Sequence, residues 1–207
     1  MEAAGAATRD ALVARARLLA SVGLVWHAVE AAVALVAGIV AGSVALVGFG
    51  ADSLVEGMAG VAVLWRFAPA RVRSDHAERR AQRLIGASFF AIAAYVTVEA
   101  VLSLTGGREP DVSYAGIALA AVTLLVMPPL ARAKASVGAQ LESSATRSEG
   151  RQNMLCAYLS AGLLVGLVAN AAAGWWWADP AAALAIAAVA AREGREAWRG
   201  DDDCCAH

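Results

Sequence analysis

The chain has 207 residues, of which 59% are hydrophobic and 17% are charged, and its formal net charge is -1. A water-soluble domain usually carries about 25% charged residues, so this composition excludes an ordinary soluble protein and indicates a single integral membrane bundle. It carries no basic excess that would indicate a nucleic-acid partner, and its three cysteines (Cys156, Cys204 and Cys205) do not form the even set of a disulfide framework.

The first apolar region predicts two membrane helices after a cytoplasmic arm at residues 1–17. From residue 18 to residue 65 the only ionisable side chains are His27, Glu30, Asp52 and Glu56. A helix needs about 20 apolar residues to cross the hydrocarbon core, so this length suits helices at 18–41 and 43–66. We expect a tight turn between them at Gly42 and Ser43.

The rest of the chain predicts four more membrane helices and a short acidic tail. Pro128 and Pro129 should bend or end the fourth helix, because proline lacks the amide hydrogen that a helix uses. Asp179 and Pro180 suit the start of the sixth helix, as its N-cap and first helical residue. The predicted helices are 84–107, 112–131, 150–174 and 178–197, within a six-helix transmembrane domain at 18–198 that precedes a tail at 199–207.

The basic residues predict the orientation of the six helices. Sixteen of the 17 Lys and Arg residues lie in the N-terminal arm, the second loop, the fourth loop and the C-terminal tail, with Arg132 and Lys134 counted in the fourth loop. Only Arg108 lies in an odd-numbered loop. Cytoplasmic loops carry the excess of Lys and Arg, so we expect both termini in the cytoplasm.

The segment GFGADSLVEGMAG places two carboxylates, Asp52 and Glu56, one helical turn apart within the second span. Side chains at this spacing are about 5–6 Å apart on one helix face. A charged group at mid-membrane costs about 2.5–3.5 kcal/mol on insertion scales, and two neighbouring carboxylates also repel each other. A divalent cation or protons would relieve this repulsion, although acids that only hold the bundle together remain an alternative.

The fifth span offers a second pair at the same spacing, Gln152 and Cys156. A zinc-like ion takes about four ligands, and a thiolate with carboxylates suits zinc or cadmium better than magnesium or calcium. The predicted metal site is therefore Asp52, Glu56, Gln152 and Cys156. A proton-coupling or secondary polar site is expected at His27, Glu30 and Glu99.

Three segments resemble the cation diffusion facilitator family: SVALVGFGADSLVEG (43–57), SSATRSEGRQNMLCAYLSA (143–161) and WWWADPAAALAI (175–186). The resemblance implies dimeric exporters of divalent transition metals, usually Zn²⁺, driven by inward proton flow and holding no permanent cofactor. It also implies a site built from a pair on helix two, matched by Asp52 and Glu56, and a pair on helix five. There the family usually has His or Asp followed by Asp, where this chain has Gln152 and Cys156.

The resemblance covers the transmembrane domain, without the soluble domain that usually follows it. The tail DDDCCAH either captures cytoplasmic metal through Cys204, Cys205 and His207 or is a solvated acidic end. We expect a multi-pass protein of a bacterial inner membrane, with metal ions, protons, lipid and a second copy of itself as partners. A non-transporting scaffold and a membrane metalloenzyme are the alternatives, and the sequence favours a protein that is not an enzyme.

Overall fold

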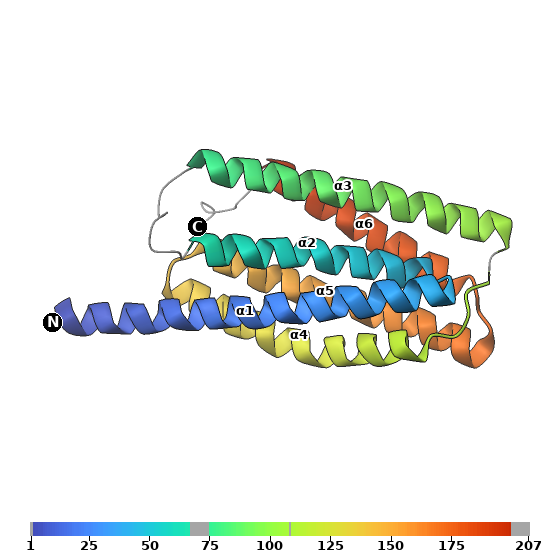
Figure 1. The fold of residues 1–207 in the computed structure, drawn as a ribbon, viewed down its shortest axis with the longest axis horizontal. Coiled ribbons are helices and arrows are strands. Elements are labelled where there is room, and N and C mark those ends of the chain that lie inside the picture. The colour runs from blue at the N-terminus through green and yellow to red at the C-terminus, as the bar shows by residue number, and fades with distance from the viewer. Residues whose placement is uncertain (1, 67–74, 108, 200–207) are drawn as a thin grey trace.

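The computed structural model describes residues 2–66, 75–107 and 109–199, and these residues form a bundle of long helices (Figure 1). The helices are α1 (Glu2–Ala41), α2 (Val44–Arg66), α3 (Asp75–Gly106), α4 (Tyr114–Gln140), α5 (Ser144–Ala173) and α6 (Ala178–Arg199). Every regular element in the described part of the chain is a helix, which confirms the predicted all-α class.

Four helical segments among the described residues are long and apolar enough to cross a membrane. They are Arg9–Ala41, Phe89–Gly106, Tyr114–Gln140 and Glu149–Ala173. The chain reverses direction at each connection, so α2 and α6 run back along these segments (Figure 1). We call the end of the bundle where α1 begins and α6 ends the termini end, and the opposite end the far end.

The helices divide into a group of four and an outer pair. Helices α1 and α2 pack closely together, as do α4 and α5, and contacts of α1 with α4 and of α2 with α5 join the two pairs. Helices α3 and α6 pack on each other and contact the group through α2 and α5. Figure 1 shows α3 and α6 together at one side of the molecule. The four-helix group encloses the site described below.

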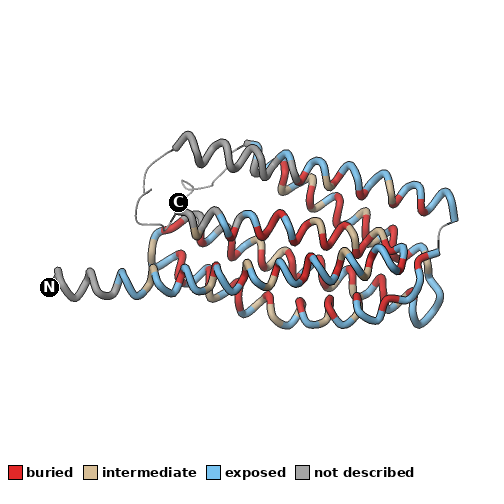
Figure 2. Tube along the Cα trace, viewed as in Figure 1, coloured by how far each residue is buried: buried red, intermediate tan, exposed pale blue. Residues whose placement is uncertain are grey.

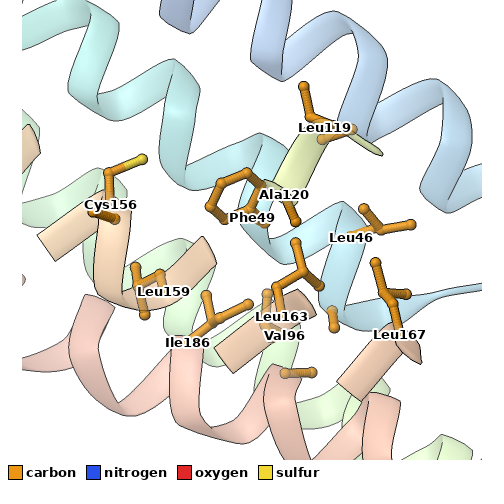
Figure 3. Close-up of a cluster of buried hydrophobic side chains, with 14 of the residues drawn as sticks. Leu46, Phe49, Val96, Leu119, Ala120, Cys156, Leu159, Leu163, Leu167 and Ile186 are labelled. Carbon is orange, nitrogen blue, oxygen red and sulfur yellow. The ribbon is translucent and has the colours of Figure 1, made fainter. Parts of the chain in front are cut away.

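The bundle is apolar outside as well as inside, as expected for a protein surrounded by lipid. Large hydrophobic side chains face outward along the helices, and Figure 2 shows exposed residues along the outer sides of the bundle. Examples are Val25, Val36, Leu125 and Val165. The buried core gathers Leu46, Phe49, Leu119 and Leu163 with Cys156 at one edge (Figure 3).

Tight turns at the far end set the lengths of the helices. Gly42 has a φ of 65°, and Ser43 begins α2 by accepting a hydrogen bond from the amide of Leu46 at 3.1 Å. The predicted turn at Gly42 and Ser43 is thereby confirmed. Gly174 ends α5 with a φ of 65°, a left-handed conformation that glycine adopts without steric cost.

Helix α4 corrects one expectation from the sequence. It does not end at Pro128 and Pro129 but continues to Gln140. Proline is tolerated inside membrane helices where neighbouring helices and side chains satisfy the freed backbone groups. Here Met127, Leu130 and Ala131 are all buried, so packing with neighbouring helices holds this part of α4 in the bundle. As a result, Arg132 and Lys134 are helical rather than loop residues.

Asp179 also has a different role from the one expected. It lies inside the first turn of α6, and its carboxylate accepts hydrogen bonds from the hydroxyl of Ser43 and, at 3.3 Å, from the amide of Ala45. The Asp179 side chain of α6 therefore caps the start of α2, because the first amides of a helix have no hydrogen-bond partner within that helix. This contact ties the two turns of the far end together.

We expect Asp179→Ala to lower the stability of the bundle by about 1.5–3 kcal/mol, the usual contribution of a hydrogen bond to a charged group. Thermal unfolding of the detergent-solubilised protein measures the effect. The exposed Asp111→Ala is the control, and a change within about 0.5 kcal/mol is expected for it. Equal melting temperatures for Asp179→Ala and wild type would contradict the cross-helix cap.

Candidate metal centre

Four side chains that bind metals in other proteins meet inside the four-helix group. His27 and Glu30 come from α1, Glu56 comes from α2 and Cys156 comes from α5. One ligand atom from each lies within 4.8 Å of every other, and all four side chains are buried. The set combines nitrogen, oxygen and sulfur donors, which is typical of sites for zinc and softer transition metals.

The convergence follows from helix geometry. His27 and Glu30 are three residues apart and share one face of α1, because residues at this spacing are neighbours on a helix surface. That face packs against α2, which brings Glu56, and α2 in turn contacts α5, which brings Cys156. Three helices thus place their donors at one level of the bundle.

Three of the distances between the donors are close to those of a tetrahedral site. Zinc bonds of about 2.0–2.3 Å place neighbouring nitrogen and oxygen ligands about 3.3 Å apart, and sulfur and oxygen ligands about 3.5 Å apart. The Nδ1 atom of His27 is 3.2 Å from Glu30 Oε2 and 3.3 Å from Glu56 Oε2. The Sγ atom of Cys156 is 3.7 Å from Glu30 Oε2. Small side-chain shifts would close the remaining separations around one ion.

Neighbouring hydroxyl groups hold Glu30 in place. Thr123 of α4 donates a hydrogen bond to Glu30 Oε1, and Ser53 of α2 donates one to Glu30 Oε2 at 3.0 Å. Polar groups that orient a metal ligand in this way commonly tune its affinity for the metal. Helix α4 therefore contributes to the site without supplying one of its four donors.

Glu56 is less satisfied than Glu30. Its Oε2 atom is buried and accepts no hydrogen bond from the described residues, although His27 lies 3.3 Å away. Most buried carboxylate oxygens have a hydrogen-bond partner, so this atom retains a lone pair that a cation can use.

The sequence predicted part of this cluster. The structure brings Glu56 and Cys156 together, and it adds His27 and Glu30, which the sequence assigned to a secondary site. Asp52 is buried on α2 one turn toward the far end, outside the four-donor set, and Gln152 is half-buried on α5 one turn toward the termini end. Glu99 is partly buried on α3 and is also outside the set. Cys204, Cys205 and His207 lie outside the described residues.

Sequence reasoning missed other buried polar residues near the cluster. Thr123 is fully buried, and Lys134, Glu149 and Asn153 form a polar group between α4 and α5. Glu149, Asn153, Cys156 and Ser160 follow one another at helical spacings of three or four residues, a stripe that is visible in the sequence. Gln152 and Cys156, the pair predicted from the sequence, have the same helical spacing but belong to a different stripe of α5.

The fold and the donor cluster together define a helical membrane protein with a cation-binding set in its core. The family model for the cation efflux transmembrane domain matches residues 20–199, and the chain belongs to this family of membrane cation transporters. The resemblance seen in the sequence is thereby confirmed. A comparison with curated proteins found no match.

We expect Thr123→Val to weaken metal binding about 10- to 100-fold, because it keeps the shape of the side chain but removes the hydroxyl that orients Glu30. Titration calorimetry with Zn²⁺ in detergent measures the affinity. Thr97→Val is the matched control, since the Thr97 hydroxyl donates to Ala93 O of its own helix, at 2.6 Å. Unchanged affinity in Thr123→Val would show that Glu30 does not need this contact.

Proposed function

We propose that the protein exports a divalent transition-metal ion, with Zn²⁺ favoured, from the cytoplasm in exchange for protons. The ion would be held by His27, Glu30, Glu56 and Cys156. The observation that carries this proposal is the convergence of these donors from three helices to within 4.8 Å of one another, in a buried position.

The chemistry of the four groups suits exchange of a metal ion for protons. Metal ligands must be deprotonated, so a bound ion requires two carboxylates, a thiolate and a neutral imidazole. A divalent cation then offsets two of the three negative charges of the set. When the ion leaves, protons can neutralise the carboxylates and the thiolate, which removes the cost of leaving charges buried. Alternate occupation by metal and by protons is what an antiporter requires.

Asp52 and Gln152 remain part of the proposal as residues on the path of the ion. Each lies one helical turn from a member of the cluster, Asp52 on the far-end side of Glu56 and Gln152 on the termini side of Cys156. Asp52 is buried and acidic, so it would receive the metal or a proton as either moves toward the far end. Gln152 can offer only a neutral amide oxygen.

The orientation and setting of the transporter are proposed from the sequence. The excess of Lys and Arg supports a cytoplasmic termini end, so metal would enter there and leave at the far end. We further propose a bacterial inner membrane and a homodimer whose contacts are made by membrane helices. Trp175 and Trp177, which are exposed and stacked at the far end with ring centroids 5.7 Å apart, suit the lipid–water interface.

Transport into proteoliposomes with an acidic lumen tests the function. We expect Zn²⁺ to accumulate, measured with a lumenal metal-sensitive dye, and expect no accumulation once the pH gradient is dissipated. Glu56→Gln and Cys156→Ala should lower uptake at least about tenfold, because each removes one of four ligands. Asp52→Ala should slow uptake as well.

Glu196→Gln is the control for this experiment, since Glu196 is an exposed acid of α6 outside the donor cluster. It should retain most of the wild-type uptake. Uptake that is unchanged in Glu56→Gln and Cys156→Ala would contradict the site. Absence of uptake of Zn²⁺, Cd²⁺, Co²⁺, Ni²⁺, Fe²⁺ and Mn²⁺ by any variant or by wild type would favour a scaffold instead.

We expect Cys156→Asp to change which metals are carried. A carboxylate in place of the thiolate removes the one soft ligand, so the ratio of Cd²⁺ to Mn²⁺ uptake should fall about tenfold or more. Competition between the two ions in the proteoliposome assay measures this ratio. Cys156→Ser, which offers a neutral oxygen, separates loss of sulfur from gain of charge. A ratio that is the same in all three proteins would show that Cys156 does not contact the ion.

A further inference from the structure

A buried ion pair lies in the same four-helix group as the metal centre. Lys134 of α4 donates to Glu149 Oε1 of α5 at 2.6 Å and is 3.4 Å from the Oδ1 atom of Asn153. Lys134 is 0% exposed and Glu149 is 4% exposed, and the second carboxylate oxygen of Glu149 has no hydrogen-bond partner among the described residues. A buried pair of this kind is a poor way to stabilise a bundle, because removing two charges from water costs about as much as their attraction returns.

The ion pair lies next to the other two helices of the group, α1 and α2, at one glycine on each. A Cβ atom added to Gly23 of α1 would lie 2.5 Å from Lys134 Nζ. A Cβ atom added to Gly60 of α2 would lie 3.4 Å from Glu149 Oε1. All four helices therefore meet at this ion pair, and Gly23 provides the space that the Lys134 ammonium group occupies.

The ion pair lies between the metal centre and the termini end. Gly23 precedes His27 by four residues, Gly60 follows Glu56 by four and Glu149 precedes Cys156 by seven. With a rise of about 1.5 Å per residue, these offsets correspond to about 6–10 Å along the bundle. Because α1 and α5 run away from the termini end and α2 runs toward it, all three offsets point toward the termini end.

The metal centre is closed differently toward the far end. There Leu46, Phe49, Leu119 and Leu163 are buried in one apolar cluster, which also includes Cys156 (Figure 3). The donors thus lie between an apolar closure on one side and an ionic closure on the other. The ionic closure can exchange its contacts for water when it opens, whereas the apolar one cannot.

We propose that Lys134 and Glu149 form the gate at the termini end of the metal path, a role that rests on the proposed transport function. When the gate is closed, Lys134 fills the axis of the four-helix group and its positive charge keeps cations out. Both members of the pair belong to the α4–α5 unit, while Gly23 and Gly60 belong to the α1–α2 unit. Separation of these two units opens the gate and exposes Glu149 as a carboxylate that attracts the incoming cation.

Labelling of Cys156 tests the gate without any metal or gradient. Cys204→Ser/Cys205→Ser protein in vesicles is treated from each side with a charged methanethiosulfonate reagent that does not cross the membrane, and the modified fraction is followed by mass spectrometry. In wild type the buried thiol should react slowly from both sides. In Lys134→Met and Glu149→Gln we expect the rate to rise about tenfold or more from the termini side only, because each variant leaves one buried member of the pair without its charged partner, and opening of this side hydrates it.

Arg192→Met is the matched control, because it removes a cation from an exposed ion pair, Arg192 with Glu196, on α6. Its labelling rate should equal that of wild type. Rates that are unchanged in Lys134→Met and Glu149→Gln, or that rise equally from both sides, would overturn the gate. Size-exclusion chromatography identifies variants that fail to fold. If Lys134→Met fails to fold, the labelling of Glu149→Gln provides the test.

A double variant separates a gate from a simple packing contact. In Lys134→Met/Glu149→Leu the pair is replaced by apolar side chains, so the bundle should fold and stay closed, with slow labelling and at least tenfold less Zn²⁺ uptake. Uptake equal to wild type would overturn the proposal, because the pair would then serve only to hold the helices. If the wild type itself carries no metal, the transport function fails, and the labelling rates still decide whether the pair closes this side.

Discussion

The cost of burying charge in a low-dielectric bundle is the constraint from which the rest of the structure follows. Each of three buried acids is matched by a partner from another helix. Glu30 of α1 accepts from Thr123 and Ser53, and Glu149 of α5 pairs with Lys134 of α4. At the far end, Asp179 of α6 caps the start of α2. Because each of these three acids has a partner on another element, these contacts fix which helices are neighbours and at what height they meet.

Close packing of α1 on α2 makes this matching possible. A Cβ atom added to Gly38 would lie 2.8 Å from the backbone nitrogen of Val47, and one added to Gly50 would lie 3.0 Å from that of Leu35. Small residues at such positions let membrane helices approach closely, where dispersion contacts replace the hydrophobic effect that is absent in lipid. Helices that are this close can place His27, Glu30 and Glu56 around one point without long side chains.

The sequence predicted the fold well, because the length of an apolar helix follows directly from the thickness of the bilayer. It also singled out His27, Glu30, Glu56 and Cys156, since an ionisable or thiol side chain inside a span stands out against Ala, Val and Leu. It could not assign them to one cluster, because that depends on how three helices pack. Lys134 was predicted to lie in a loop, because Pro128 and Pro129 were expected to end the fourth helix, which in fact continues to Gln140. Glu149 and Asn153 were not predicted, because Cys156 belongs to two helical stripes of α5. The sequence could not show whether the stripe with Gln152 or the one with Glu149 and Asn153 faces the site.

The two closures around the metal centre give the bundle an asymmetry that suits directed exchange. Opening the far end separates Phe49, Leu46 and their neighbours, and wetting apolar surface costs about 25 cal/mol per Å². Opening the termini end instead hydrates Lys134 and Glu149, which regain the solvation that they lost on burial. The termini end is therefore the less costly side to open when the donors hold no ion. In the proposed exchange, opening at the far end would draw on a change in the charge of the donors themselves, which would link release of the metal to the arrival of protons.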